Sequence, residues 1–203
     1  MKLVRYADDF VVMIAGQRGD AEALWDEVGA VLAPMGLRLS VDKSRICHID
    51  EGFEFLGWRI QRRARRSRTG KTAIYTIPSK KALASIIDKV RTLTRRAKHR
   101  TLADLLRRLN PVLRGWCTYF HHGVSKRTFN YVDNFAFRRI FGWLSKRHPR
   151  LNKHTIARRF LPDWKVASDG VEMFHPATVA IVRYRYRGTR IPTPWSSPTQ
   201  TAA

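Results

Sequence analysis

The sequence LVRYADDFVVMI, residues 3–14, places two adjacent carboxylates, Asp8 and Asp9, between two short apolar runs. Runs rich in valine and aromatic residues favour β-strands, and an Asp-Asp pair between them favours a tight hairpin turn. Such a turn holds two like charges close together, an arrangement that a divalent cation stabilises. The stretch therefore predicts half of a magnesium site for two-metal phosphoryl transfer. The competing interpretation is an acidic turn that faces solvent.

The residues that follow predict an α+β fold, with one helix packed on antiparallel strands. A helix is expected from Asp20, a favourable N-cap, to about Ala33. Its apolar face would carry Leu24, Val28 and Leu32, which recur every fourth residue. Further strands are expected over residues 37–41, 46–49, 53–60 and 72–77.

The middle of the chain has the apolar spacing of three amphipathic helices. Ser79, Thr101 and Ser125 are the expected N-caps, and Pro111 is expected to kink or restart the second helix. A short helix is expected over residues 155–160, an amphipathic strand over residues 179–187, and a disordered tail from residue 192.

Charge is divided very unevenly along the 203 residues, whose formal net charge is +23. Residues 1–61 carry 7 Lys/Arg and 10 Asp/Glu, whereas residues 62–203 carry 32 and 6. Six basic residues fall between Gln61 and Lys71, in a segment expected to be a loop that contacts phosphates. This distribution indicates a polyanionic partner, most simply nucleic acid, although a ribosomal protein would have similar totals.

The two cysteines, Cys47 and Cys117, are far apart and form no metal-ligand pattern. We interpret both as core thiols of a protein in a reducing compartment, and we expect a cytoplasmic location. Arg5, Asp8 and Asp9 interrupt any apolar core of a signal peptide. No apolar run is long enough to span a membrane, so no membrane partner is expected.

Five segments together resemble the C-terminal part of a group II intron-encoded reverse transcriptase/maturase. RYADDFVV (5–12) resembles the polymerase motif with two metal-binding aspartates, and GLRLSVDKSRI (36–46) and GFEFLGWRI (52–60) resemble the next two palm segments. LNPVLRGWCTYFHHGVSKRTF (109–129) and WLSKRHP (143–149) resemble the maturase-specific X domain. The resemblance extends from Leu3 to about Arg187. The order of these segments is more specific than YADD alone.

The resemblance implies a partial reverse-transcriptase palm followed by an α-helical thumb/maturase domain. The implied domains are residues 1–77 (end of the palm), 78–160 (thumb and maturase-specific domain) and 161–203 (a basic extension). It further implies that Asp8 and Asp9 bind Mg2+ if the site is competent for polymerisation, and that Tyr6 approaches the growing primer end. Phe55, Leu56, Gly57 and Trp58 would help to hold the primer. The residues expected to contact RNA are Arg62, Arg63, Arg65, Arg66, Lys80, Lys81, Arg95, Arg96, Arg114, Lys126, Arg127, Arg138 and Arg139.

The chain also departs from the family pattern. It begins two residues before the YADD strand, so the third metal-binding aspartate and the fingers of the family are not in this sequence. We therefore expect no polymerisation by this chain alone. The expected partners are group II intron RNA, a DNA target and primer, and an N-terminal reverse-transcriptase fragment. Two alternatives stay open: an RNA-binding splicing cofactor without polymerase function, and a non-functional truncated remnant.

Overall fold

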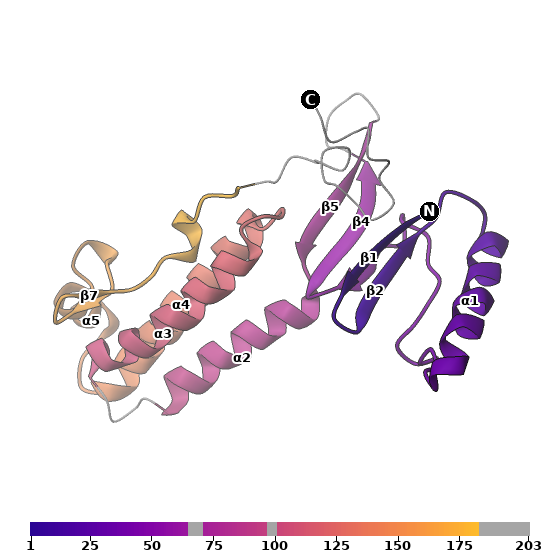
Figure 1. Cartoon of the computed structure of the whole chain (residues 1–203). Coiled ribbons are helices and arrows are strands. Elements are labelled where there is room, and N and C mark those ends of the chain that lie inside the picture. The colour runs from indigo at the N-terminus through magenta and orange to yellow at the C-terminus, as the bar shows by residue number, and fades with distance from the viewer. Residues whose placement is uncertain (65–70, 97–100, 183–203) are drawn as a thin grey trace, which may run out of the picture.

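The computed structural model describes residues 1–64, 71–96 and 101–182, and it confirms an α+β fold (Figure 1). A hairpin, a helix and a small sheet come first, and a helical bundle follows them. The strands are β1 (Lys2–Tyr6), β2 (Asp9–Met13), β3 (Phe53–Phe55), β4 (Trp58–Ala64), β5 (Thr72–Pro78), β6 (Ala167–Ser168) and β7 (Val171–Glu172). The helices are α1 (Arg18–Leu32), α2 (Lys80–Arg96), α3 (Leu102–Phe120), α4 (Lys126–Arg147) and α5 (Lys153–Phe160).

Helix α1 begins three residues earlier than expected. Gln17 is the N-cap, and its backbone N–H donates to Asp20 Oδ2 at 2.7 Å. Asp20 therefore lies at the third helical position, where its carboxylate accepts the N-cap N–H in a capping box. The helix ends near the expected residue, in a short 3₁₀ turn that Gly36 closes with φ of 70°.

The segment expected as one strand over residues 53–60 is instead a hairpin. Phe55 pairs with Trp58, and Leu56 and Gly57 form the two-residue turn between β3 and β4. Both turn residues have positive φ, 48° and 77°, a backbone conformation typical of two-residue hairpins. Strand β4 then continues to Ala64 and pairs with β5, so the basic segment begins as a strand and not as a loop.

Residues 37–49 form no strand, which corrects the two strands expected at 37–41 and 46–49. Their backbone runs from α1 to β3 through turns, such as the one in which Ser44 N–H donates to Ser40 O at 2.9 Å. The alternation of Leu37, Leu39 and Val41 is a strand pattern, but a strand also needs a partner for its backbone hydrogen bonds. No neighbouring strand lies beside this segment in the described part of the chain.

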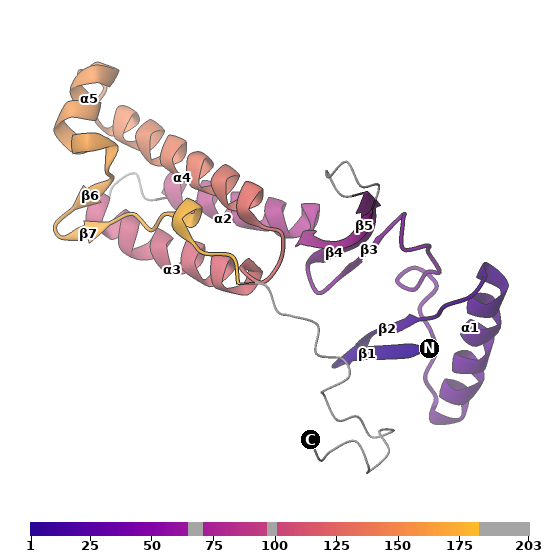
Figure 2. The same cartoon turned by 90° about the horizontal axis from the view of Figure 1, so that it is seen from above.

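Helices α2, α3 and α4 pack together into a bundle with a continuous apolar core (Figures 1 and 2). Two expected N-caps are confirmed: Ser79 Oγ accepts from Ala82 N–H at 3.1 Å, and Thr101 Oγ1 accepts from Asp104 N–H at 3.2 Å. Helix α3 runs through Pro111 without restarting, although proline removes one backbone donor there. The fully buried core side chains include Ile86, Val90, Leu105, Leu106, Leu109, Leu113, Val132 and Ile140.

Residues 161–182, here called the C-terminal strap, lie along α3 and α4. Met173 and Val166 of the strap are buried in the bundle core. Asn110 of α3 holds the strap by its side chain: Nδ2 donates to Glu172 O, and Oδ1 accepts from Phe174 N–H, both at 2.8 Å. Residues 179–182 of the expected strand are irregular, and its remainder, like the expected tail, lies outside the described residues.

The described residues among the first 77 form no core of their own. Among residues 1–64 and 71–77, Gly52 is the one buried residue, and α1 has no buried side chain. The domain boundaries stay predictions; the first, between residues 77 and 78, lies at the last residue of β5, shortly before α2. Within the described ranges, no helix is both long enough and apolar enough to cross a membrane.

Candidate functional site: the YADD hairpin and the cationic bundle

The YADD sequence forms the tip of a two-stranded antiparallel hairpin. Tyr6 of β1 pairs with Asp9 of β2, so Ala7 and Asp8 are the two turn residues. Ala7 has φ of 50°, and its carbonyl accepts a hydrogen bond from Arg5 Nε at 2.9 Å. The expected hairpin is thus confirmed, with the turn one residue earlier than the Asp-Asp pair.

This hairpin brings Tyr6, Asp8 and Asp9 together at one exposed end. Two adjacent carboxylates suit Mg2+, which binds through one or two carboxylates together with substrate phosphates. Among the residues that the structure describes, no group of three or more His, Cys, Asp or Glu could hold a metal ion. Binding of Mg2+ by Asp8 and Asp9 stays a prediction.

Both faces of the YADD hairpin carry apolar side chains. The β1–β2 register places Val4 on the face of Tyr6 and Asp9, and Leu3 and Phe10 on the opposite face. Leu3 is 48% exposed, and Val4 and Phe10 are each 40% exposed. A strand that is apolar on both faces is typical of a sheet covered on both sides. The hairpin thus has the side chains of a buried strand pair and the exposure of a surface one.

The predicted primer-holding residues form the β3–β4 turn, and helix α3 contacts it directly. Tyr119 Oη donates to the carbonyl of Leu56 at 2.8 Å, across 63 residues of sequence. Trp58 packs edge-on against Phe120, with ring centroids 4.8 Å apart. A side chain on Gly123 would overlap the Trp58 ring, so glycine permits this close approach. The turn is therefore fixed by the end of α3.

Five of the predicted RNA contacts already have partners within the protein. Arg63, exposed on β4, donates from Nε to Gln61 Oε1 at 2.8 Å. Arg62 forms a bidentate pair with Asp50, at 2.5 and 2.9 Å, and its hydrogen bond lowers the pKa of that carboxyl. Arg139 Nε donates to Thr94 Oγ1 at 3.0 Å and so links α4 to α2. Lys126 donates to Ala177 O of the strap, and Arg114 lies over the Phe174 ring at 5.3 Å. Their contacts with RNA stay predictions.

The other predicted cations lie on several elements. Lys80, Lys81 and Arg95 are exposed on α2, and Arg127 and Arg138 are exposed on α4. Arg96 belongs to the last turn of α2. Arg65 and Arg66 lie outside the described residues. Arg127 and Arg138 are eleven positions apart, which returns them to nearly the same side of α4.

Two further cations on α3, Arg107 and Arg108, were missed by the sequence interpretation. Both are exposed, and Arg107 pairs with Asp104 at 3.3 Å. Leu105, Leu106 and Leu109 mark the apolar face of this helix in the sequence. Because Arg107 and Arg108 fall between them, the helical period could have assigned both arginines to the opposite, solvent-facing side.

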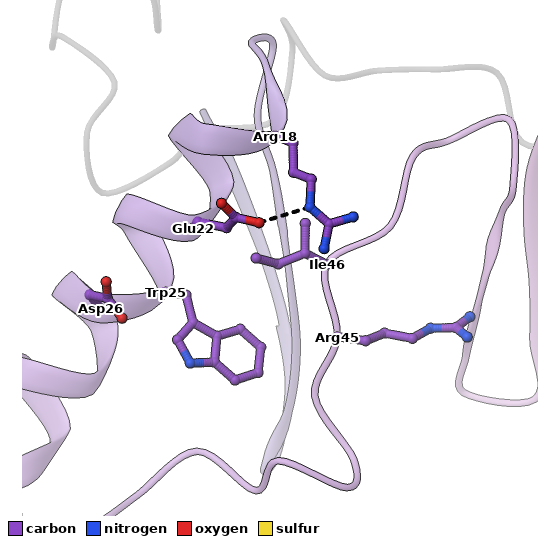
Figure 3. Close-up of a pocket in the computed structure, with 6 residues that line it drawn as sticks. All are labelled: Arg18, Glu22, Trp25, Asp26, Arg45 and Ile46. Carbon is purple, nitrogen blue, oxygen red and sulfur yellow. Dashed lines mark hydrogen bonds and ion pairs between the residues drawn. The ribbon is translucent and has the colours of Figure 1, made fainter.

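An open hollow of about 300 Å³ lies between α1 and the segment that follows it (Figure 3). Trp25 and Ile46 supply its apolar wall, and Arg18 Nε donates to Glu22 Oε1 at 2.7 Å beside them. Arg45 extends away from this pair towards the backbone of Gly52, which accepts its hydrogen bond at 3.4 Å. The half-buried Trp25 indole reflects the thin packing of this part of the chain.

Two family models match separate parts of the chain. Residues 1–60 match the model of the reverse transcriptase (RNA-dependent DNA polymerase) family, and residues 83–161 match that of the group II intron maturase-specific domain. The two matches, in this order along the chain, support the C-terminal part of a group II intron-encoded reverse transcriptase/maturase.

Two relatives illustrate how much of the family the chain represents. Over 95 residues it is 42% identical to protein YkfC of Escherichia coli, covering 43% of this chain and 24% of YkfC. Over 160 residues it is 28% identical to the group II intron-encoded protein LtrA of Lactococcus lactis, covering 68% of this chain and 26% of LtrA. The chain thus spans about a quarter of the length of these curated relatives.

Proposed function

We propose that the chain binds intron RNA through the cationic surface of its helical bundle, as a splicing cofactor. The observation that carries this proposal is the exposed charge on a well-packed scaffold. Arg127 and Arg138 of α4 and Arg95 of α2 are exposed, on a bundle whose core is continuous. A rigid cationic face contacts the phosphates of folded RNA without requiring one sequence. The match of residues 83–161 to a group II intron maturase-specific domain supports intron RNA as the partner.

The test is the salt dependence of RNA binding, measured by filter binding with a structured intron RNA. The double variant Arg127→Gln/Arg138→Gln removes two positive charges from α4. We expect the slope of log K against log salt to fall by roughly one for each phosphate that the variant no longer neutralises. The control Arg38→Gln/Lys43→Gln removes the same charge from exposed residues outside the bundle. Equal losses of affinity in the two double variants would show that binding depends only on the net charge of the chain. That result would refute a specific RNA-binding surface on the bundle.

We propose a second role, in which the YADD hairpin and the β3–β4 turn belong to an RNA-directed DNA polymerase site. Asp8 and Asp9 would hold Mg2+, which stabilises the charge that develops when a phosphoryl group is transferred. Tyr6 would lie against the primer end, and Phe55, Leu56, Gly57 and Trp58 would hold the primer. The exposed apolar faces of the YADD hairpin support a missing partner, which we take to be an N-terminal reverse-transcriptase fragment.

This second role is tested by mixing the chain with a purified fingers–palm fragment of a group II intron reverse transcriptase. The assay is extension of a DNA primer on an RNA template in the presence of Mg2+. We expect extension with the mixture, and loss of extension with Asp8→Asn. If the mixture shows no extension, or if Asp8→Asn does not change the extension, the polymerase role is refuted. The RNA-binding role would then be the whole proposed function. We also propose a cytoplasmic location, which the two unpaired cysteines, Cys47 and Cys117, support.

A further inference from the structure

A second hollow, of about 780 Å³, lies where the end of α3 meets β4 and β5. It is open to solvent, and its volume falls within the usual range for small-ligand sites. The sequence analysis predicted a role in holding the primer for one of its lining residues, Trp58, but it did not predict a site formed with helix α3. Its lining residues are Trp58, Thr76, Gly115, Thr118, Tyr119, His122 and Gly123.

Two aromatic rings form one wall of this hollow. Trp58 and Tyr119 are stacked, with ring centroids 6.2 Å apart and planes at 27°. Phe120 packs edge-on against Tyr119 at 4.7 Å, and the Tyr119 hydroxyl is held by the Leu56 carbonyl. Tyr119 nevertheless stays 50% exposed. The ring is therefore held in place before any ligand arrives, which lowers the entropy cost of stacking on it.

Gly115 leaves the hollow open on the side of α3. This glycine is exposed, and a Cβ built on it would meet no atom within 4 Å. Thr118 lies about one turn further along α3, and His122 follows just after the C-cap of the helix. The Thr118 hydroxyl is a polar group beside the aromatic wall, and His122 Nδ1 already lies 3.0 Å from the Val182 carbonyl oxygen. The hollow thus combines a flat apolar surface with hydrogen-bonding groups at its edge.

A cation lies on the same side of α3. Arg108 precedes Gly115 by seven residues, which returns it to nearly the same direction around the helix, about 10 Å along the axis. The Arg108 residue is exposed. If an RNA strand placed one base in the hollow, its sugar–phosphate backbone would pass close to the Arg108 guanidinium. A guanidinium binds phosphate oxygens well.

We propose that this hollow binds one unpaired nucleobase of RNA, stacked on the Tyr119 and Trp58 wall, with a neighbouring phosphate on Arg108. This inference rests on the proposed RNA binding and adds the recognition of single-stranded nucleotides. A base inside a duplex has both faces covered by its neighbours, whereas an unpaired base can turn its face to an aromatic side chain.

The first test fills the hollow with Gly115→Leu. Gly142→Leu is the matched control, because Gly142 is also helical and also has no atom within 4 Å of a built Cβ. With single-stranded oligouridine, we expect Gly115→Leu to weaken binding by about 5- to 150-fold, the range for losing one base stack. The salt slope should stay unchanged, because no charge is removed. The control should bind as tightly as the wild type.

The second test separates stacking from other contacts. Tyr119→Phe keeps the ring and its contacts with Trp58 and Phe120 but loses the hydrogen bond to Leu56 O, so it should bind oligouridine more tightly than Tyr119→Ala. Tyr119→Ala should match Gly115→Leu. Photocrosslinking with 5-iodouridine in the RNA should attach to Tyr119 or Trp58, as mapped by mass spectrometry. A blunt RNA duplex should bind Gly115→Leu and wild type equally.

The outcomes distinguish this inference from the proposed function. If wild type and Gly115→Leu bind single-stranded RNA equally, the nucleobase site is refuted while RNA binding stands. If Gly115→Leu weakens the duplex as strongly as the single strand, the hollow contacts backbone and not a base, which also refutes it. If the wild type binds no RNA, both proposals fail.

Discussion

Removing the side chain of Asn110 should loosen the C-terminal strap from helix α3. This amide donates to Glu172 O and accepts from Phe174 N–H, both at 2.8 Å. Each hydrogen bond contributes roughly 0.5–1.5 kcal/mol, so Asn110→Ala should lose about 1–3 kcal/mol of unfolding free energy. Alanine regains up to about 0.7 kcal/mol through its higher helix propensity. The control Asn134→Ala, at an exposed position inside α4, has the same propensity gain without these two bonds.

The assay is urea unfolding followed by circular dichroism, with the two alanine variants compared under one set of conditions. We expect Asn110→Ala to be less stable than Asn134→Ala by about 1–3 kcal/mol, which for a chain of this size lowers Tm by roughly 2–4 °C per kcal/mol. Asn110→Asp keeps the acceptor and loses the donor, so its stability should lie between those of Asn110→Ala and wild type. Equal stability of the two alanine variants would refute the role assigned to Asn110.

Burial raises the pKa of the Cys117 thiol to about 12, so its thiolate is scarce at pH 8. Iodoacetamide at pH 8 should label the half-buried Cys47 in the native protein and label Cys117 only after unfolding in urea. Equal labelling of both cysteines in the native protein would refute the burial of Cys117. Gly123→Ala should destabilise the fold by about 1–3 kcal/mol, because the added Cβ overlaps the Trp58 ring. Gly142→Ala should gain up to about 1 kcal/mol in helix α4, and thermal unfolding of both variants checks the contrast.

Local hydrogen bonding makes part of the fold predictable from sequence. Ser79 and Thr101 are recognisable as N-caps because a hydroxyl next to an amphipathic run satisfies backbone donors of the first turn. The YADD hairpin is predictable because two apolar runs flank a short polar turn. Each of these signals depends on residues only a few positions apart.

Elements that depend on distant partners are harder to predict. Residues 37–41 alternate like a strand and form none, because no neighbouring strand in the described ranges pairs with them. The Leu56–Gly57 turn was missed because leucine is unusual at positive φ, and the contact that holds it comes from Tyr119. The Asp169–Gly170 turn between β6 and β7 did have a recognisable Asp-Gly signal, which the sequence interpretation did not use.

Predicting the candidate site from sequence has the same limit. The carboxylates of Asp8 and Asp9 are identifiable because they are adjacent in the chain. Charge alone predicts RNA contacts for Lys126 and Arg139, whereas their internal partners, Ala177 and Thr94, are more than 40 residues away in sequence. Charge patterns indicate the class of partner, but they do not show which cations already stabilise the fold.

The hydrogen bond between Tyr119 and the Leu56 carbonyl has a mechanical consequence. It joins the last turn of α3 to the tip of the β3–β4 hairpin, and Trp58 and Phe120 are interlocked beside it. A rotation of the helical bundle would therefore move this tip with it, because these contacts couple the two parts. Among the described residues, the apolar cluster around Phe120 includes Trp58 but no side chain of β1 or β2. A rotation of the bundle relative to β1 and β2 would thus change the distance between the two aspartates and the turn predicted to hold the primer.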